Sequence, residues 1–220
     1  MAAVTRIFLG VTGASGAAYA MTALRALTDA GCEVGLCVSR NGAHVINHEI
    51  LDAGRQAPQD HDAVIREFVA RSGAAAGQVT VLGLDDLTAP FASGSSLAPA
   101  ALICPCSGST LASIAHGVTR NLIHRCADVM LKERRTLVLM TRETPLSLIH
   151  IENMAAVTRA GAIVMPASPG FYSHPTDVSQ LVDFMVGKAL DHLGVPHGLL
   201  VRWGEDGAMA GPSDPTTARP

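Results

Sequence analysis

The stretch R-I-F-L-G-V-T-G-A-S-G, residues 6–16, decides the fold because it joins a short apolar run to a glycine-rich turn. Beyond it, apolar residues recur at helical spacing from Ala17 to Leu27, and Gly31 ends the pattern. The stretch therefore predicts a strand, a tight turn and a helix in succession. Backbone N–H groups at the start of such a helix are free to bind an anion, so the turn favours a nucleotide-like ligand.

Three familiar motifs are absent from this turn. It is not the G-x-G-x-x-G of dinucleotide-binding sheets, and no Gly-Lys-Ser/Thr follows to make a P-loop. Ala17 stands where the G-x-S-x-G nucleophile elbow has its second glycine. Ser15 is explained equally well as a ligand-binding hydroxyl and as a simple helix N-cap, so this turn alone leaves both interpretations open.

The rest of the chain continues the alternation of strands and helices. We expect strands at 6–11, 33–38, 78–82, 100–104, 136–140 and 162–165, with helices between them and a last helix from about 178 to 194. This order predicts an α/β fold of the flavodoxin-like or Rossmann-like kind. We expect a single domain with an open, mainly parallel sheet and helices on both faces. The domain should span residues 1–203, and the Gly/Pro/Ser/Thr-rich segment 204–220 should be a flexible tail.

Composition narrows the class of protein. The 220 residues are 48% hydrophobic and 16% charged, with a net charge of -3, which offers no electrostatic footprint for nucleic acid. Mean hydropathy is +0.29, so we expect part of the apolar surface to be covered by other subunits. No apolar run approaches the roughly 20 residues of a membrane span, and no signal peptide is visible, so we expect a cytoplasmic protein.

Metal and redox chemistry find little support in the sequence. The five cysteines form no C-x-x-C pair, and we interpret them as small packing residues. His44 and His48 lie one helical turn apart, a spacing that zinc sites also use, but no third ligand is near. Solvated or interface histidines are therefore favoured, and we expect no metal site.

The strand expected at 136–140 is followed by Thr141-Arg142-Glu143-Thr144-Pro145. Loops at the carboxyl ends of parallel strands usually carry the ligand site. Arg142 beside Glu143 indicates anion binding joined to proton transfer, although a surface ion pair is about equally compatible with two residues alone. Thr144 and Pro145 predict the N-cap and first residue of the next helix.

A second strand-to-helix turn follows the strand expected at 100–104. The residues Pro105-Cys106-Ser107-Gly108-Ser109-Thr110 supply hydroxyls and helix-terminal amides, so two such turns in one small domain favour a shared cofactor. Ser39-Arg40 after the second strand either binds the phosphate of a mononucleotide or has no role in ligand binding. The loop 90–96 is either a flexible connection without a function or a lid over a ligand. The basic run 132–135 is explained by the favourable interaction of cations with the carboxyl end of a helix dipole.

Several blocks in this order resemble one family. They are G-V-T-G-A-S-G (10–16), P-C-S (105–107), N-L-I (121–123), A-D-V (127–129), L-K-E-R-R (131–135) and R-E-T-P-L-S (142–147), extended by His150, Glu152-Asn153-Met154 and Phe171-Tyr172. From about Arg6 to Trp203 the chain is similar to the flavin prenyltransferases, the UbiX-type enzymes formerly called aromatic-acid decarboxylase subunits.

The resemblance implies a flavodoxin-like fold that binds FMN and assembles as a homododecamer. It implies metal-independent transfer of a dimethylallyl group from dimethylallyl phosphate to N5 and C6 of reduced FMN. The prenylated FMN so made would serve a partner decarboxylase of the UbiD type.

The resemblance also assigns expected roles to individual positions. The residues implied to hold FMN are Gly13, Ala14, Ser15, Ser39, Cys106, Ser107, Gly108, Ser109 and Arg142. Those implied to hold the prenyl phosphate are Lys132, Arg142, Tyr172 and Lys188, with Trp203 walling the site and Glu49 reaching into a neighbouring subunit's site. Glu143 would move protons, and with Arg142 and Lys132 it forms the expected catalytic group.

Two positions depart from the family pattern, and two other functions remain open. Gly108-Ser109 stand where relatives often carry a bulkier or basic pair. Lys188 stands where many relatives have arginine, and a lysine cannot bind a phosphate in the bidentate way that arginine does.

One alternative function is an FMN-dependent decarboxylase of the phosphopantothenoylcysteine type, which needs a catalytic histidine early in the chain, a role for which His44 could be offered. The other is a non-catalytic flavin carrier.

Overall fold

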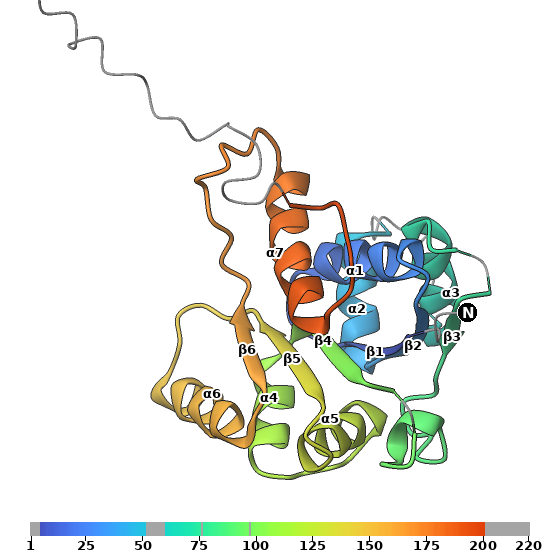
Figure 1. Ribbon diagram of the computed structural model, residues 1–220, viewed down its shortest axis with the longest axis vertical. Helices are drawn as coiled ribbons and strands as arrows, with labels where there is room; N and C mark the ends of the chain where they lie inside the picture. The colour runs from blue at the N-terminus through green and yellow to red at the C-terminus, as the bar shows by residue number, and fades with distance from the viewer. Residues whose placement is uncertain (1–4, 52–59, 76, 97, 201–220) are drawn as a thin grey trace, which may run out of the picture.

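The computed structural model describes residues 5–51, 60–75, 77–96 and 98–200. Within them a six-stranded sheet has the order β3-β2-β1-β4-β5-β6, and every neighbouring pair is parallel (Figure 1). The strands are β1 (Arg6–Val11), β2 (Glu33–Val38), β3 (Val79–Val81), β4 (Ala100–Cys106), β5 (Thr136–Thr141) and β6 (Ile163–Pro166). The predicted open parallel sheet is confirmed.

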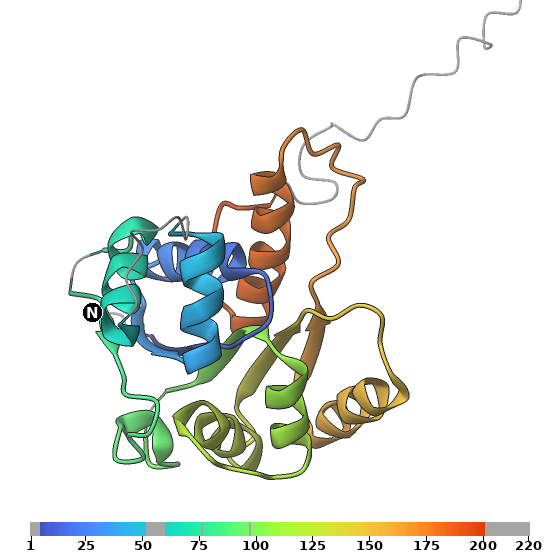
Figure 2. The same cartoon turned by 180° about the vertical axis from the view of Figure 1, so that it is seen from behind.

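Helices cover both faces of this sheet (Figures 1 and 2). One face is covered by α1 (Ala17–Asp29), α2 (Arg40–Glu49), α3 (His61–Ser72) and α7 (Val178–Leu193). The other face is covered by α4 (Gly108–Ala115), α5 (Leu122–Lys132), α6 (Leu148–Ala160) and the short η1 (Pro90–Ala92). Successive strand residues point to opposite faces. Leu9 thus packs in the core under α1, whereas Phe8 packs in the core under α5.

Helix α6 begins later than the sequence pattern predicts. The N-cap is Ser147 rather than Thr144, and Pro145 follows a cis peptide bond in the preceding bend. The reason is a capping box, in which the Ser147 side chain accepts from the His150 N–H while the His150 side chain accepts from the Ser147 N–H. The predicted start at Thr144-Pro145 is therefore wrong.

Helix α1 also starts differently from one of the two interpretations of Ser15. Its N-cap is Gly16, at φ 120° in a conformation that favours glycine, and no side chain caps the helix from that position. Ser15 is therefore not the N-cap residue.

The segment 167–177 between β6 and α7 leaves the body of the fold as an extended arm (Figures 1 and 2). The expected wall residue Trp203 and the expected tail 204–220 lie outside the described residues. Among the helices that the structure describes, none is long and apolar enough to cross a membrane.

Candidate active site

The order of the strands reverses between β1 and β4, and such a switch point is where open parallel sheets bind ligands. Thr12, buried directly after β1, joins the two turns there. Its Oγ1 donates to the Pro105 carbonyl at 2.7 Å and accepts from the Ser107 N–H at 2.8 Å. Its own N–H also donates to the Pro105 carbonyl, at 3.2 Å. The sequence patterns gave Thr12 no role, although a hydroxyl at the end of a buried strand could have drawn attention to it.

Close packing fixes the β1–α1 turn against α2. A methyl group on Gly13 would lie 2.5 Å from Asn41 Cβ, and one on Gly42 would lie 2.6 Å from the Val11 carbonyl oxygen. Ser39 caps α2 by accepting from the Gly42 N–H at 3.0 Å, while its own N–H donates to the Val11 carbonyl at 2.9 Å. The predicted flavin residues Gly13 and Ser39 therefore belong to one rigid corner of the switch point.

Glu49, the last residue of α2, places its carboxylate at the start of α1. Its Oε2 accepts from the Gly16 N–H at 2.9 Å and from the Ala17 N–H at 2.8 Å. Burial by itself would raise the pKa of Glu49, but hydrogen bonds from Ser15, Gly16 and Ala17 and the charge of Arg142 lower it below its ordinary value.

This contact corrects one expectation of the sequence. The amides of Gly16 and Ala17 at the start of α1 are not free, because they already bind a carboxylate. The contact places the Glu49 carboxylate at the switch point of its own chain, and its expected reach into a neighbouring subunit's site stays a prediction.

The β4–α4 turn contributes hydroxyls and a closely packed glycine. Ser107 caps α4 by accepting from the Thr110 N–H, and its Oγ lies 3.1 Å from Ser109 Oγ. The Cys106 thiol is buried, and burial raises its pKa to about 12, so it is an unreactive packing group at neutral pH. Gly108 faces the imidazole of His150 from α6.

The carboxyl end of β5 holds two buried polar atoms that have no partner in the described part of the chain, Thr141 Oγ1 and Arg142 Nε. Glu143 is exposed, and its Oε1 accepts from the Thr144 N–H at 3.1 Å. The described ion pairs do not join Arg142 to Glu143, so the surface-pair interpretation is not supported. A buried guanidinium N–H without an acceptor in the described residues, on an arginine whose charge lowers the pKa of Glu49, fits a site that takes an anionic ligand.

Known proteins resemble this chain over most of its length. A family model described as Flavoprotein matches residues 1–190. The flavin prenyltransferase UbiX of Pseudomonas aeruginosa is 48% identical over 91% of this chain and 94% of its own length. This chain belongs to the flavin prenyltransferase family.

Solved structures of the family superpose well. A crystal structure of AnUbiX in complex with FMN and dimethylallyl pyrophosphate matches with a TM-score of 0.78 at 39% identity, over 91% of this chain and 97% of that one. A dodecameric FMN-dependent UbiX-like decarboxylase from Escherichia coli O157:H7 matches with a TM-score of 0.76 at 36% identity, over 88% and 97%. A PPC decarboxylase, at 18% identity and a TM-score of 0.51, shares the fold alone.

Not every residue that the family resemblance assigned lies at the switch point. Lys132 ends α5, which leads to the amino end of β5, whereas Arg142 follows the carboxyl end of that strand. Six strand residues separate the two ends by roughly 20 Å at the usual rise per residue. The Lys132 ammonium instead contacts Glu133 and lies beside Gly94. Lys132 and Arg142 of one flavin prenyltransferase chain therefore do not meet.

The other two phosphate residues lie on α7 and on the arm before it. Lys188 is exposed on α7. Tyr172 lies on the arm 167–177, where its ring packs edge-on against Phe184 with a centroid distance of 5.6 Å.

The basic run at the end of α5 has a role that the sequence did not indicate. Arg135 donates to the carbonyls of Gly94, Ser96 and Ala98 at 2.7, 2.6 and 3.2 Å. Arg125 donates to the Ala92 carbonyl at 3.0 Å. The loop 90–96 is thus tied to α5, and the run does more than complement the helix dipole.

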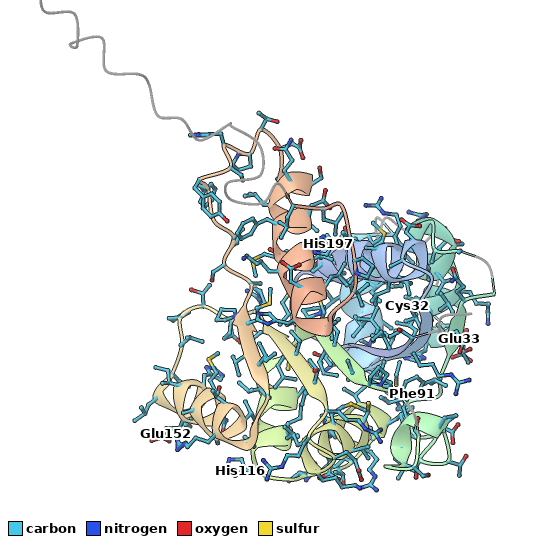
Figure 3. All side chains as sticks on the ribbon, viewed as in Figure 1. Cys32, Glu33, Phe91, His116, Glu152 and His197 are labelled. Carbon is cyan, nitrogen blue, oxygen red and sulfur yellow. The ribbon has the colours of Figure 1, made fainter. Side chains whose placement is uncertain are left out.

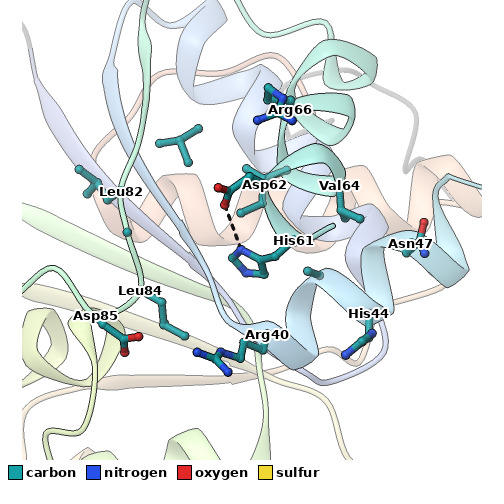
Figure 4. A pocket seen from close by; sticks show the side chains of 14 residues that line it. Arg40, His44, Asn47, His61, Asp62, Val64, Arg66, Leu82, Leu84 and Asp85 are labelled. Atoms are coloured by element: carbon teal, nitrogen blue, oxygen red, sulfur yellow. Dashed lines mark hydrogen bonds and ion pairs between the residues drawn. The ribbon is translucent and has the colours of Figure 1, made fainter. Parts of the chain in front are cut away.

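A cavity of about 740 Å³ lies beside α2 and α3 (Figure 4). It opens between α2, α3 and the segment after β3, where His61 Nδ1 lies 3.3 Å from Asp62 Oδ1. None of the residues that the family resemblance assigned lines it. The unpartnered Arg142 Nε and the two hydroxyl-rich turns place the candidate site of this flavin prenyltransferase at the switch point instead.

Proposed function

We propose that this chain transfers a dimethylallyl group from dimethylallyl phosphate to reduced FMN and so makes prenylated FMN. The single observation that carries this proposal is the buried Arg142 Nε without a partner, beside two amide- and hydroxyl-bearing turns, in a chain 48% identical to a flavin prenyltransferase. Bound FMN supplies the ring positions, N5 and C6, that accept the group.

The residues at the switch point suit the binding of a flavin mononucleotide. The backbone of Gly13, Ala14, Gly108 and Ser109 and the hydroxyls of Ser15, Ser39 and Ser107 supply donors, Cys106 packs beneath them, and Arg142 supplies a positive charge. We assign the flavin to these residues. Their contribution is to hold the ring in one orientation and to exclude water from the reacting face.

Loss of the prenyl group leaves a phosphate whose charge must be stabilised. Arg142, Lys132, Tyr172 and Lys188 are the groups that we assign to this task, since cations and a phenol O–H can all donate to phosphate oxygens. Glu143, which is exposed and follows Arg142 after β5, is assigned the proton that leaves the flavin ring.

We further propose that each site is completed by a neighbouring subunit. Because Lys132 and Arg142 of one chain lie near opposite ends of β5, one phosphate would contact both only if they came from different chains. Helix α6 supports an assembly, since Leu148, Ile149 and Ile151 are 68, 67 and 50% exposed on its surface. We propose a homododecamer, because the UbiX-like decarboxylase from Escherichia coli O157:H7 is dodecameric.

The product would be consumed by a decarboxylase of the UbiD type, and we propose such an enzyme as the partner. The proposal rests on the chemistry of the product: a modified flavin is useful only to an enzyme that employs it as a cofactor.

An anaerobic assay tests the activity. Reduced FMN and dimethylallyl phosphate are incubated with the enzyme, and the flavin product is identified by its mass. We expect a gain corresponding to one dimethylallyl group. A flavin carrier would bind FMN and leave its mass unchanged, and a parallel incubation with dimethylallyl pyrophosphate identifies the preferred donor.

A further inference from the structure

The imidazole of His150 lies between the start of α6 and the start of α4. On one side, its Nδ1 lies 3.3 Å from the Ser147 backbone nitrogen and 3.2 Å from Ser147 Oγ. On the other side, it faces Gly108, the first residue of α4. None of the sequence motifs assigns this side chain a function.

The capping contact decides which ring nitrogen of a neutral His150 carries the proton. The Ser147 N–H can only donate, so Nδ1 must accept. A neutral imidazole whose Nδ1 accepts has its hydrogen on Nε2. Glutamate or glutamine usually fills this position of a capping box, and an ionised glutamate there has no N–H to donate.

The edge of the imidazole that carries Nε2 lies next to the β4–α4 turn. A methyl group on Gly108 would lie only 3.0 Å from Nε2 and 3.2 Å from Cδ2, so the imidazole occupies the space that a larger residue would need. In the described part of the chain, no protein atom accepts a hydrogen bond from Nε2, and the ring is only half-buried. The donor is therefore available to a ligand.

We infer that His150 is a flavin-binding residue, whose Nε2–H donates a hydrogen bond to an oxygen of the FMN held at the β4–α4 turn. This inference rests on the proposed function. It also explains why glycine occupies position 108, because the absence of a side chain lets the imidazole approach the first turn of α4.

The test separates flavin binding from helix capping. His150→Gln restores the usual capping box but removes the imidazole from Gly108, whereas His150→Ala removes both contacts. Kd is measured by flavin fluorescence for FMN and for riboflavin, and the melting temperature is measured without ligand. We expect His150→Gln to melt with the parent protein and to bind FMN about 5–10-fold more weakly, the loss of one hydrogen bond.

The two ligands locate the contact. An equal loss for FMN and riboflavin places the acceptor on the ring system or the ribityl chain, and a loss confined to FMN places it on the phosphate. His116→Gln is the matched control. His116 lies at the far end of α4, where its Nε2 is 3.1 Å from Asn153 Oδ1 of α6 (Figure 3). We expect no change in its FMN affinity.

A double-mutant cycle tests the contact with Gly108. Gly108→Ala should push the imidazole aside and weaken FMN binding, yet add little to the loss in His150→Gln. Unchanged FMN affinity in His150→Gln, or full additivity with Gly108→Ala, overturns the inference and leaves His150 as a helix cap. A parent protein that does not bind FMN at all overturns the proposed function itself, so the two failures are distinguishable.

Discussion

Glu49 Oε2 lies 2.8 Å from the Ala17 backbone nitrogen, so a carboxylate at the end of α2 occupies the positive end of α1. These residues are 32 positions apart in the chain, and their contact brings a titratable group into the switch point. The hydrogen bonds and the Arg142 charge that lower the pKa of Glu49 make its ionised form the one that the folded chain favours.

The pH dependence of stability should therefore carry a contribution from Glu49. Its pKa is lower in the folded chain than in the unfolded one, so the contribution is fully present above the ordinary value, about 4.3, and is lost as the pH falls through the lowered folded value. We expect Glu49→Gln to melt below the parent at pH 7, with the difference shrinking as the pH falls through the lowered pKa of the folded chain. A difference that does not vary with pH would contradict this account. Glu152→Gln, an exposed change on α6, is the control.

Arg142→Ala should impair use of the prenyl phosphate more than it impairs flavin binding. Loss of hydrogen bonds from a charged group costs about 1.5–3 kcal/mol, so kcat/KM for dimethylallyl phosphate should fall roughly 10–100-fold. Arg159→Ala on α6, where the guanidinium donates to the Ala155 carbonyl at 3.3 Å, should leave kcat/KM unchanged. Parental kcat/KM in Arg142→Ala would remove Arg142 from the phosphate site.

Glu143→Gln keeps the shape of the side chain and removes its capacity to take a proton. FMN should bind with parental affinity, and turnover should drop by about 10²–10⁴-fold, the usual contribution of a general base. The measurement is single-turnover formation of prenylated FMN at saturating dimethylallyl phosphate. A rate near that of the parent would reduce Glu143 to a structural group bound to the Thr144 N–H.

Mixed oligomers test whether sites are shared between subunits. Lys132→Ala and Arg142→Ala homo-oligomers should each be poorly active, but co-assembly of the two chains should restore activity, because some sites then combine an intact Lys132 with an intact Arg142. The double variant Lys132→Ala/Arg142→Ala co-assembled with either single variant is the control. Failure of the mixture to regain activity, with mixing verified by native mass spectrometry, would contradict a shared site.

Turnover should survive dialysis against a chelator. In the described ranges, no three His, Cys, Asp or Glu side chains gather closely enough to hold a metal ion, and the groups assigned to the phosphate are cations of the protein itself. The measurement is the rate of prenylated FMN formation before dialysis, after dialysis and after addition of Mg²⁺. A loss that Mg²⁺ restores would show that a metal neutralises the phosphate.

The sequence by itself determined the sheet and the family. Strands β1 and β2 begin and end at the predicted residues, because buried parallel strands are continuous apolar runs bounded by turn residues, and that signal is local. The blocks from Gly10 to Tyr172 identified the flavin prenyltransferases, which the 48% identity confirms. The roles of individual site residues stay predictions.

Tertiary structure alone decided how the site is assembled. Thr144-Pro145 is a good local helix start, yet the pairing of Ser147 with His150 moved the start of α6 and aimed an imidazole at Gly108. Glu49 reached the amides of α1 because Gly42 lets α2 pack against the end of β1. Lys132 and Arg142, only ten positions apart, were separated because an extended strand runs between them. The alternation of buried and exposed residues can be read from neighbouring positions in the sequence. Contacts between turns depend on how whole helices and strands pack, and no short stretch of sequence specifies that packing.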